Sequence, residues 1–437
     1  MPVPISIVEA ARQLRAGKLT PLELFGQCLE QIHKYEDTIH AWVLVDEAGA
    51  CQTATERSRE AALGQWRGPL HGIPVGIKDI IDVQGLVTGA GSPLCGHQSA
   101  PADAPVVADL RRAGAVILGK TVTVEFACFD PPPTRNPWNL AHTPGGSSSG
   151  SAAALAMGMC LGALGTQTGG SLVRPSTYCG VATCKPTFGK LSTEGIVPVS
   201  ASLDHVGPMA HKVGDLALLL DCLLGAATPR PLRPLGPPRL GLLDTTVFAE
   251  ADEGVRQATR SAMEELTQSG AEIQLLSVPQ MFGDVLKMHR QIMAVEAAAF
   301  HRERFASYRG QYGPMIASLL DEGLAVAAVD YVAAKVWHRE FRRQAAGLLD
   351  GLDALIMPST HTTAPATLAT TGTPQFQVPW SLARLPVVSI PCGVAADGMP
   401  AGIQLIGRAN DESKLLRMSA WCEQALGFDA LPALWEC

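Results

Sequence analysis

The chain has 437 residues, of which 47% are hydrophobic and 17% are charged. These proportions are typical of a globular protein with a large core and exclude a disordered chain. The 34 lysines and arginines stand against 41 aspartates and glutamates, so the net charge is −7 and no surplus of positive charge is offered to a phosphate backbone. We therefore expect no nucleic-acid partner.

Cysteine usage and apolar runs bear on the compartment. The 11 cysteines occur singly, without a CxxC pair, which favours reduced thiols over a disulfide framework or a zinc site. The apolar run Ile5–Val8 is interrupted at once by charged residues and does not resemble an export signal. No run reaches the roughly 18 apolar residues of a membrane span. We expect a cytoplasmic protein with no metal, no cofactor and no membrane partner.

The N-terminal segment is predicted to be helical. Ser6 and Glu9 have the spacing of a capping box. Thr20 and Glu23 repeat that spacing, and the apolar residues that follow recur at helical intervals. We expect these helices to form a cover, over residues 1–66, on the outside of a larger core.

From residue 68 the pattern changes to short apolar runs punctuated by glycine. Gly72–Ile77 and Ala115–Leu118 are predicted buried strands, and Val106–Arg112 between them is a predicted helix. The apolar stretch Ala152–Leu164 is predicted to be one buried core helix. Strands that alternate with helices are typical of the α/β class.

Residues 228–238 contain five prolines and are predicted to form a surface connection. This connection could be a domain boundary. The α/β pattern resumes after it, with predicted strands at Leu240–Leu243 and Ile273–Val278 and a predicted helix at Gly254–Gln268. Further predicted elements are helices at 283–305 and 323–348 and strands at Leu352–Met357, Val387–Ile390 and Gly402–Ile406. No change of composition isolates them, so one large α/β domain is favoured.

Two Gly-Gly-Ser turns adjoin the predicted core helix. Residues 143–151 read Thr-Pro-Gly-Gly-Ser-Ser-Ser-Gly-Ser, and Gly165–Ser171 follows the far end of the helix. Glycines let the backbone approach a ligand and present amide hydrogens to an anion or oxyanion, although such clusters are also ordinary loops. A phosphate-binding loop is not favoured, because no GxxxxGK[ST] pattern occurs here.

A serine nucleophile needs a base. Asp204 and His205 suggest a Ser-His-Asp assembly, but the GxSxG turn that usually carries such a serine is missing. Lys78 ends a predicted buried strand, where burial favours the neutral amine, and a neutral amine can act as a base. An ion pair with Asp79 is the structural alternative.

Several motifs then occur in order along the chain. They are Gly72–Asp79, Asn136–Asn139, Pro144–Ser151, Gly169–Ser171 with Arg174–Pro175, Cys179–Gly180 and Lys185–Thr187. With these motifs the chain resembles the amidase signature family over nearly its whole length. The resemblance implies a single large domain with a central mixed β-sheet covered by helices on both faces, and a signature core over residues 68–210.

The resemblance also assigns roles. It implies that Ser171 is the nucleophile, that Ser147 is a bridging serine in a cis peptide after Gly146, and that Lys78 is the base. Ser171 would attack the carbonyl, its proton would pass through Ser147 to the neutral Lys78, and water would later hydrolyse the acyl-enzyme. The expected oxyanion hole consists of backbone N–H groups of Thr168, Gly169, Gly170 and Ser171.

Two positions depart from the family pattern. Gln167 stands where many relatives carry an acidic residue, and the resulting Gly-Thr-Gln-Thr-Gly-Gly-Ser form resembles malonamidase-like amidases. The usual Asn-Leu-x-Gly-Leu-Pro is replaced by Ser-Leu-Ala-Arg-Leu-Pro, beginning at Ser381. These departures concern the specificity of the pocket.

Four residues are predicted to bind substrate: Phe129, Gln167, Arg174 and Trp380. Arg174 could anchor a substrate carboxylate, but a role in organising the site is favoured. The two aromatic residues fall in segments that line the acyl pocket of relatives, with ordinary aromatic core packing as the alternative.

The favoured function is hydrolysis of small linear amides, with esters and carbamates as further candidates. One alternative is the A subunit of a tRNA-dependent amidotransferase, which releases ammonia from glutamine; the shorter chain and Gln167 argue against it. Another is a catalytically inactive binding module, which the intact Lys78, Ser147 and Ser171 disfavour. The expected partner is a small-molecule amide, and the sequence leaves a homodimer open.

Overall fold

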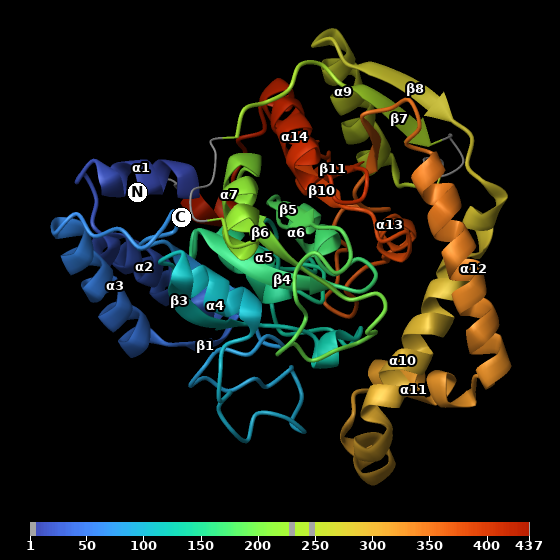
Figure 1. Ribbon diagram of the computed structural model, residues 1–437, viewed down its shortest axis with the longest axis horizontal. Coiled ribbons are helices and arrows are strands. Elements are labelled where there is room, and N and C mark those ends of the chain that lie inside the picture. Colours follow the sequence, from blue (N-terminus) through green and yellow to red (C-terminus); the bar gives the residue numbers. More distant parts are fainter. Residues whose placement is uncertain (1–5, 227–231, 244–249, 437) are drawn as a thin grey trace.

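A single β-sheet of 11 strands runs through the protein, whose structure is a computed structural model that describes residues 6–226, 232–243 and 250–436 (Figure 1). The strand order is β1-β3-β2-β4-β6-β5-β10-β11-β9-β7-β8. Parallel and antiparallel pairs both occur, and helices pack on both faces. The predicted α/β class with a central mixed sheet is confirmed.

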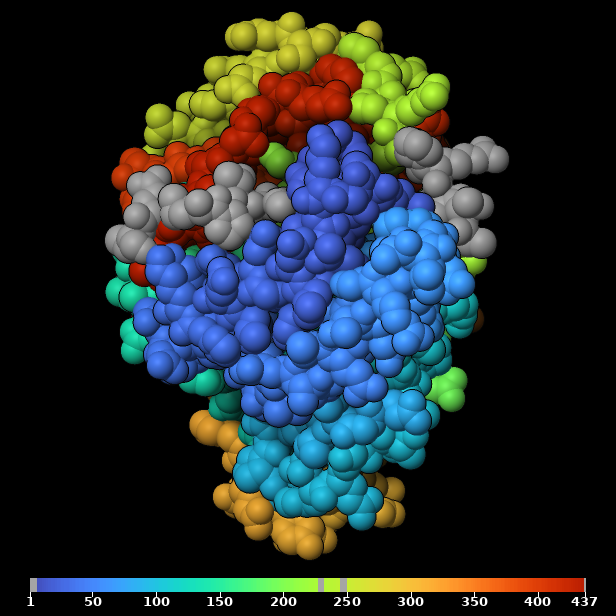
Figure 2. All heavy atoms as spheres, turned by 90° about the vertical axis from the view of Figure 1, so that its left-hand side faces the viewer, coloured from blue at the N-terminus to red at the C-terminus, as the bar shows by residue number. Residues whose placement is uncertain are grey.

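The N-terminal segment consists of α1 (Ile7–Arg15), α2 (Pro21–Ile39), β1 (Trp42–Val45) and α3 (Glu47–Ala62). Both predicted helix starts are present, and Thr20 and Glu23 form a complete capping box. These residues cover the middle of the face that Figure 2 turns toward the viewer. Strand β1 was not predicted, because its four residues are too few to show an alternating pattern.

The middle of the chain supplies the centre of the sheet. Its elements are β2 (Pro74–Lys78), α4 (Pro105–Arg112), β3 (Val116–Thr121), α5 (Ser149–Ala156), β4 (Gly162–Gln167), α6 (Val173–Tyr178), β5 (Ala182–Lys185), β6 (His205–Ala210) and α7 (Val213–Leu223). Strand β2 lies between β3 and β4 and is parallel to both. The edge strand β1 is antiparallel to β3.

The predicted core helix over Ala152–Leu164 is wrong. Helix α5 ends at Ala156, Gly158 adopts a φ of +62°, and the chain re-enters the sheet as β4 at Gly162. Every residue of α5 and β4 is buried, so the sequence lacks the polar positions that reveal whether an apolar stretch has helical or strand periodicity. The second Gly-Gly-Ser turn therefore follows a strand.

The C-terminal part extends the same sheet. Its elements are β7 (Arg239–Leu243), α9 (Glu253–Gln268), β8 (Glu272–Leu276), α10 (Val285–Tyr308), α11 (Pro314–Ala325), α12 (Ala328–Gly347), β9 (Ala354–Pro358), α13 (Val378–Leu382), β10 (Val387–Val394), β11 (Pro400–Ile406) and α14 (Glu412–Leu426). The prediction of one continuous helix over 323–348 is wrong near its start. The chain is extended at Val326, so α11 ends at Ala325 and α12 begins at Ala328. Helices α10, α11 and α12 lie together on the side opposite the N-terminal helices (Figure 1).

The proline-rich connection does not divide the sheet. Residues 228–231 of the predicted 228–238 connection lie outside the described residues. Beyond it, β7 pairs with β9, and β9 pairs with β11 of the central strands. Among the described residues, no helix has both the length and the hydrophobicity needed to cross a membrane. All described cysteines are free thiols.

Candidate active site

The end of one central strand and two loops meet at one edge of the sheet. Lys78 is the last residue of β2, and the neighbouring parallel strand β4 ends in the turn Thr168–Ser171, called here the nucleophile turn. Ser147 lies in the loop that leads into α5. Parallel neighbours place their carboxyl ends at the same sheet edge, so the strand order brings these segments together. Ser147 and the nucleophile turn line one cavity of about 230 Å³.

Lys78 is fully buried with hydroxyl partners. Its Nζ donates to Ser147 Oγ and to Thr166 Oγ1, each at 2.7 Å. Burial lowers the pKa of Lys78 to about 7, so a large fraction of the amine is neutral near neutral pH. The alternative pairing with Asp79 does not form, because the Asp79 carboxylate lies 3.0 Å from Lys120 Nζ.

The two serines occupy different positions in the cavity. The Gly146–Ser147 peptide bond is cis, as the resemblance implied. Ser147 is buried, whereas Ser171 is partly exposed. Within the described part of the chain no hydrogen bond joins the two hydroxyls. The contact between Lys78 and Ser147 is therefore formed, whereas the contact between Ser147 and Ser171 is open.

The nucleophile turn has unused amide donors. No hydrogen bond among the described residues engages the amide hydrogens of Gly169, Gly170 or Ser171. A Cβ on Gly170 would lie 2.6 Å from Gln377 Oε1, so a side chain there would require Gln377 to move. Thr168 lines the same cavity, and free amide donors beside a serine hydroxyl are what the predicted oxyanion hole requires.

The Ser-His-Asp alternative is not supported by the positions of its residues. His205 is buried with Nδ1 at 3.3 Å from the carbonyl oxygen of Gln167, and it does not line the cavity. Desolvation lowers its pKa well below the usual value. Asp204 accepts a hydrogen bond from Thr168 Oγ1 at 2.5 Å, and burial raises the pKa of its carboxyl to about 6.

Phe129 and Arg174, two of the four predicted substrate-binding residues, line the cavity. Arg174 Nη2 donates to the carbonyl oxygen of Gly146 at 2.7 Å and to Thr371 Oγ1 at 3.2 Å. Its Nη1 donates to the carbonyl oxygen of Gly372 at 3.0 Å. Arg174 therefore fixes the peptide that precedes Ser147, which supports the site-organising alternative.

Gln167 does not line the cavity and contacts protein groups instead of substrate. Its Oε1 accepts from the backbone N–H groups of Leu172 and Val173 at 2.9 and 3.0 Å. Its Nε2 donates to Ser381 Oγ at 2.9 Å. A fully buried amide must satisfy its hydrogen bonds locally, and the start of α6 supplies the nearest donors. The structure thus shows protein contacts for Gln167, and its contact with substrate stays a prediction.

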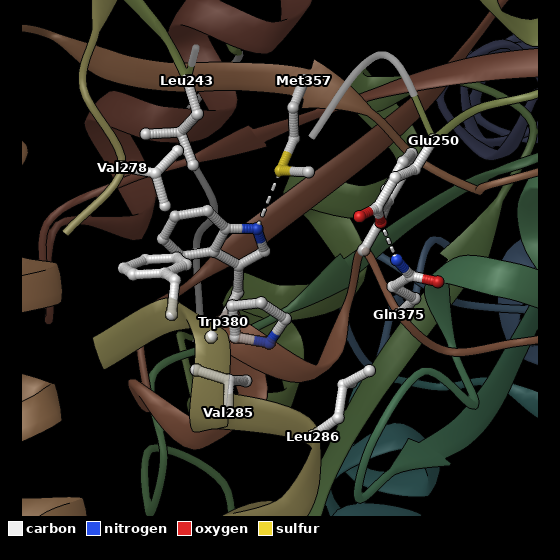
Figure 3. Close-up of a pocket in the computed structure, with 12 residues that line it drawn as sticks. Leu243, Glu250, Val278, Val285, Leu286, Met357, Gln375 and Trp380 are labelled. Atoms are coloured by element: carbon white, nitrogen blue, oxygen red, sulfur yellow. Dashed lines mark hydrogen bonds between the residues drawn. The ribbon is translucent and has the colours of Figure 1, made fainter. Parts of the chain in front are cut away.

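Trp380 lines a second cavity, of about 270 Å³, and its Nε1 donates to Met357 Sδ at 3.0 Å (Figure 3). Residues two apart on a helix point in different directions, so Val378 of α13 lines the cavity of Ser171 while Trp380 does not. The two cavities share Leu286. The contact of Trp380 with substrate therefore stays a prediction, and the structure places this residue in the neighbouring cavity.

Helix α10 supplies cavity residues that the sequence analysis missed. They are Leu286, His289, Arg290 and Met293. The buried His289 holds the carbonyl oxygen of Thr168, with its Nε2 at 3.0 Å. No motif marks these residues. Their spacing of three or four is the signal of one helix face, but that spacing does not reveal what the face contacts.

Comparisons with known proteins show the family to which the chain belongs. A family model described as Amidase matches residues 23–416. The A subunit of the glutamyl-tRNA(Gln) amidotransferase of Roseiflexus castenholzii is 36% identical, across 95% of this chain and 94% of that protein. The putative amidase AmiD of Mycobacterium tuberculosis is 30% identical, across 97% and 94%.

Solved structures extend the likeness to three dimensions. The native peptide amidase from Stenotrophomonas maltophilia superposes with a TM-score of 0.84 at 30% identity, covering 98% of each chain. A crystal structure described as that of an amidase gives a TM-score of 0.89 at 32% identity, covering 96% of this chain and 99% of its own. The likeness therefore covers the whole fold as well as the motifs.

Proposed function

The chain belongs to the amidase family, and we propose that within it the protein is a free-standing amidohydrolase that cleaves the C–N bond of small, non-peptide linear amides. The observation that carries the proposal is the 2.7 Å contact of a buried Lys78 with Ser147 in the cavity of Ser171. Lysine with hydroxyl partners and a lowered pKa is suited to proton transfer.

The reaction would proceed in two stages. Ser171 Oγ attacks the amide carbonyl while its proton moves to Ser147 and the proton of Ser147 moves to the neutral Lys78. The oxyanion accepts hydrogen bonds from the nucleophile turn. When the C–N bond breaks, the Lys78 ammonium returns a proton through Ser147 to the leaving nitrogen. Water then attacks the acyl ester by the same relay, which releases the acid and restores Ser171.

The cavity suits a small acyl group with at most one negative charge. Apolar side chains from separate elements, Val124, Met293 and Val378, form part of its wall, and none of the described lining residues is acidic. Both arginines of the lining already have partners: Arg174 holds the loop before Ser147, and Arg290 pairs with Glu322 at 2.7 Å. Esters and carbamates of similar size should also be accepted, because an acyl-enzyme route tolerates several leaving groups.

The second candidate is the A subunit of a tRNA-dependent amidotransferase, which the 36% identity to the Roseiflexus castenholzii protein favours. Such a protein would take glutamine, whose α-ammonium and α-carboxylate call for two opposite charges. The described lining offers no carboxylate for an ammonium group. We therefore place this candidate second.

The test is a substrate panel with the purified chain alone. Aliphatic, aryl and carboxylate-bearing amides, together with matched esters and carbamates, are incubated with the wild type and with Ser171→Ala. We expect turnover by the wild type without ATP, tRNA or a second protein, and none by the variant. A chain that is inert until a second protein is added, and that then prefers glutamine, would establish the amidotransferase function instead.

A further inference from the structure

We propose that His289, Ser381 and Gln167 are positioning residues that hold the nucleophile turn. Their hydrogen bonds fix two successive peptide groups so that the amide hydrogens of Gly169 and Gly170 remain available to the oxyanion. This inference deepens the proposed function and rests on it. None of the three side chains is required to touch the reacting atoms.

The first peptide is held from α10. His289 is buried, and desolvation lowers its pKa, so the ring is neutral at neutral pH. The carbonyl oxygen of Thr168 can only accept, so His289 Nε2, 3.0 Å away, carries the hydrogen. The C=O and N–H bonds of a trans peptide point in opposite directions. Holding this carbonyl toward α10 therefore directs the amide hydrogen of Gly169 away from α10.

The second peptide is held from α13. Ser381 Oγ donates to the carbonyl oxygen of Gly169 at 2.7 Å, which directs the amide hydrogen of Gly170 away from α13. A serine hydroxyl has one hydrogen, and this carbonyl uses it. The contact of 2.9 Å between Ser381 and Gln167 must therefore be a donation from Gln167 Nε2.

The orientation of the Gln167 amide is fixed at its other end. Oε1 accepts from the backbone N–H groups of Leu172 and Val173, so Nε2 is the atom that faces Ser381. The donor and the acceptor are thereby assigned in every hydrogen bond that links Gln167, Ser381 and the carbonyl oxygen of Gly169. A carboxylate at position 167 would accept the same two backbone hydrogens, which stabilise its charged form. It could not donate to Ser381, and would draw the serine hydrogen away from Gly169.

This assignment makes the residues at positions 167 and 381 depend on each other. An acidic residue at 167 needs a partner at 381 with two hydrogens, one for the carboxylate and one for the carbonyl of Gly169. The asparagine of the usual motif has two such N–H hydrogens. Ser381 has only one, so it needs a donor at 167, and glutamine is that donor. The two positions are therefore expected to act as a coupled pair.

The experiment compares kcat and KM of variants on an amide and an ester that share one acyl group. His289→Leu removes the first donor, and His289→Gln restores an N–H. Gln167→Glu removes the N–H group that donates to Ser381, so the serine hydrogen is drawn to the carboxylate. Combining Gln167→Glu with Ser381→Asn provides two N–H hydrogens, one for the carboxylate and one for the carbonyl oxygen of Gly169. His301→Gln is the matched control, because His301 is a buried histidine of the same helix that contacts Tyr312 and not the cavity.

We expect kcat to fall roughly 10- to 100-fold in His289→Leu and Gln167→Glu, up to the cost of losing one oxyanion donor. The amide and the ester should lose equally, since both form an oxyanion, and the pH midpoint set by Lys78 should stay in place. His289→Gln and the double variant should recover most of the loss. A purely structural defect would not be rescued in this way.

Two results would overturn the inference: wild-type kcat in both His289→Leu and Gln167→Glu, or no recovery in either rescue variant. Labelling by a fluorophosphonate tests the proposed function independently of this inference, because the labelling requires only a reactive Ser171. An unlabelled and inactive wild type would contradict the proposed function itself, and with it this inference. A labelled, active wild type whose variants retain full kcat would contradict the inference alone.

Discussion

Lys78 combines complete burial with two hydroxyl partners and no carboxylate within hydrogen-bonding distance among the described residues. A lysine in such surroundings is costly to protonate, and its pKa falls to about 7. The neighbouring Asp79 is neutralised by Lys120 and so does not reverse the effect. The sequence also allowed Lys78 to be an ion-pair partner of Asp79. In the structure this pair does not form, so the Lys78 amine is available to exchange protons.

The first prediction concerns pH. A base must be neutral to accept a proton, so kcat/KM should rise with pH below the folded pKa of Lys78, which is about 7, and level off above it. Lys78→Met should lose nearly all amide turnover and the rise with it. The measurement is kcat/KM for an uncharged amide from about pH 5 to about pH 9. A profile that falls across this range, or a rise that survives in Lys78→Met, would place the base elsewhere.

The second prediction concerns Ser147, whose proposed role is to carry protons between Lys78 and Ser171. Ser147→Ala should lower kcat for an amide by about 10² to 10⁴-fold, the usual contribution of acid–base catalysis. A p-nitrophenyl ester of the same acyl group should lose much less, because its leaving group needs little protonation. Stopped-flow and steady-state rates on the matched pair give the comparison. Equal losses on both substrates would show that Ser147 does not protonate the leaving group.

At the residue scale, the sequence predicted which residue types occur together but not the direction in which each side chain points. The Gly-Gly-Ser turns and the buried lysine carry their chemistry in residue type and spacing, and the structure brings Lys78 and the two turns together. The sequence did not predict the protein contacts of Gln167 or the second cavity beside Trp380, because a linear motif does not show which way a side chain points. Val378 and Trp380 lie on the same short helix, yet the first lines the cavity of Ser171 and the second lines another.

At the scale of elements, the region between the two Gly-Gly-Ser turns shows how a glycine decides between helix and strand. Gly158 ends α5 at a φ of +62°, and Trp435 packs directly against it. The left-handed conformation turns the chain so that β4 can enter the sheet and deliver the nucleophile turn. Because every residue of α5 and β4 is buried, the hydrophobic pattern did not predict the end of the helix, although the sequence contains the glycine.

The third prediction tests that break by adding one methyl group. A Cβ at Gly158 would lie 2.3 Å from Trp435 Cη2, whereas a Cβ at Gly64, which also has a positive φ, meets nothing within 4 Å. Gly64→Ala should cost about 1 to 2 kcal/mol of unfolding free energy from the backbone alone. Gly158→Ala should cost a further 1 to 3 kcal/mol, approximately, for the displaced ring. Urea unfolding of both variants measures the difference, and equal costs would contradict the packing argument.

At the scale of the whole molecule, the sequence predicted one α/β domain because strands recur on both sides of the proline-rich connection. Pairing of β7 with β9 bears this out. The long-range arrangement was less accessible. His289 of α10 and Thr168 of the nucleophile turn are 121 residues apart in the sequence, yet they are in contact. Such contacts depend on topology, which no local spacing encodes.

The cavity is assembled from several separate segments of the chain. Groups that would perform the chemistry come from β2, from the loop before α5 and from the turn after β4, and the cavity is closed by α10 and α13 of the same chain. The described lining therefore comes from segments that lie far apart in the sequence.

The most direct test is to trap the acyl-enzyme on the purified chain. Wild-type protein is mixed with an activated ester of a small acyl group, quenched in acid during the burst and analysed by peptide mass spectrometry, with Ser171→Ala treated in parallel. We expect the acyl mass on the peptide that contains Ser171, no such adduct in the variant, and no turnover by the variant. An adduct on Ser147, Ser148 or a cysteine, or turnover that survives Ser171→Ala, would contradict the account.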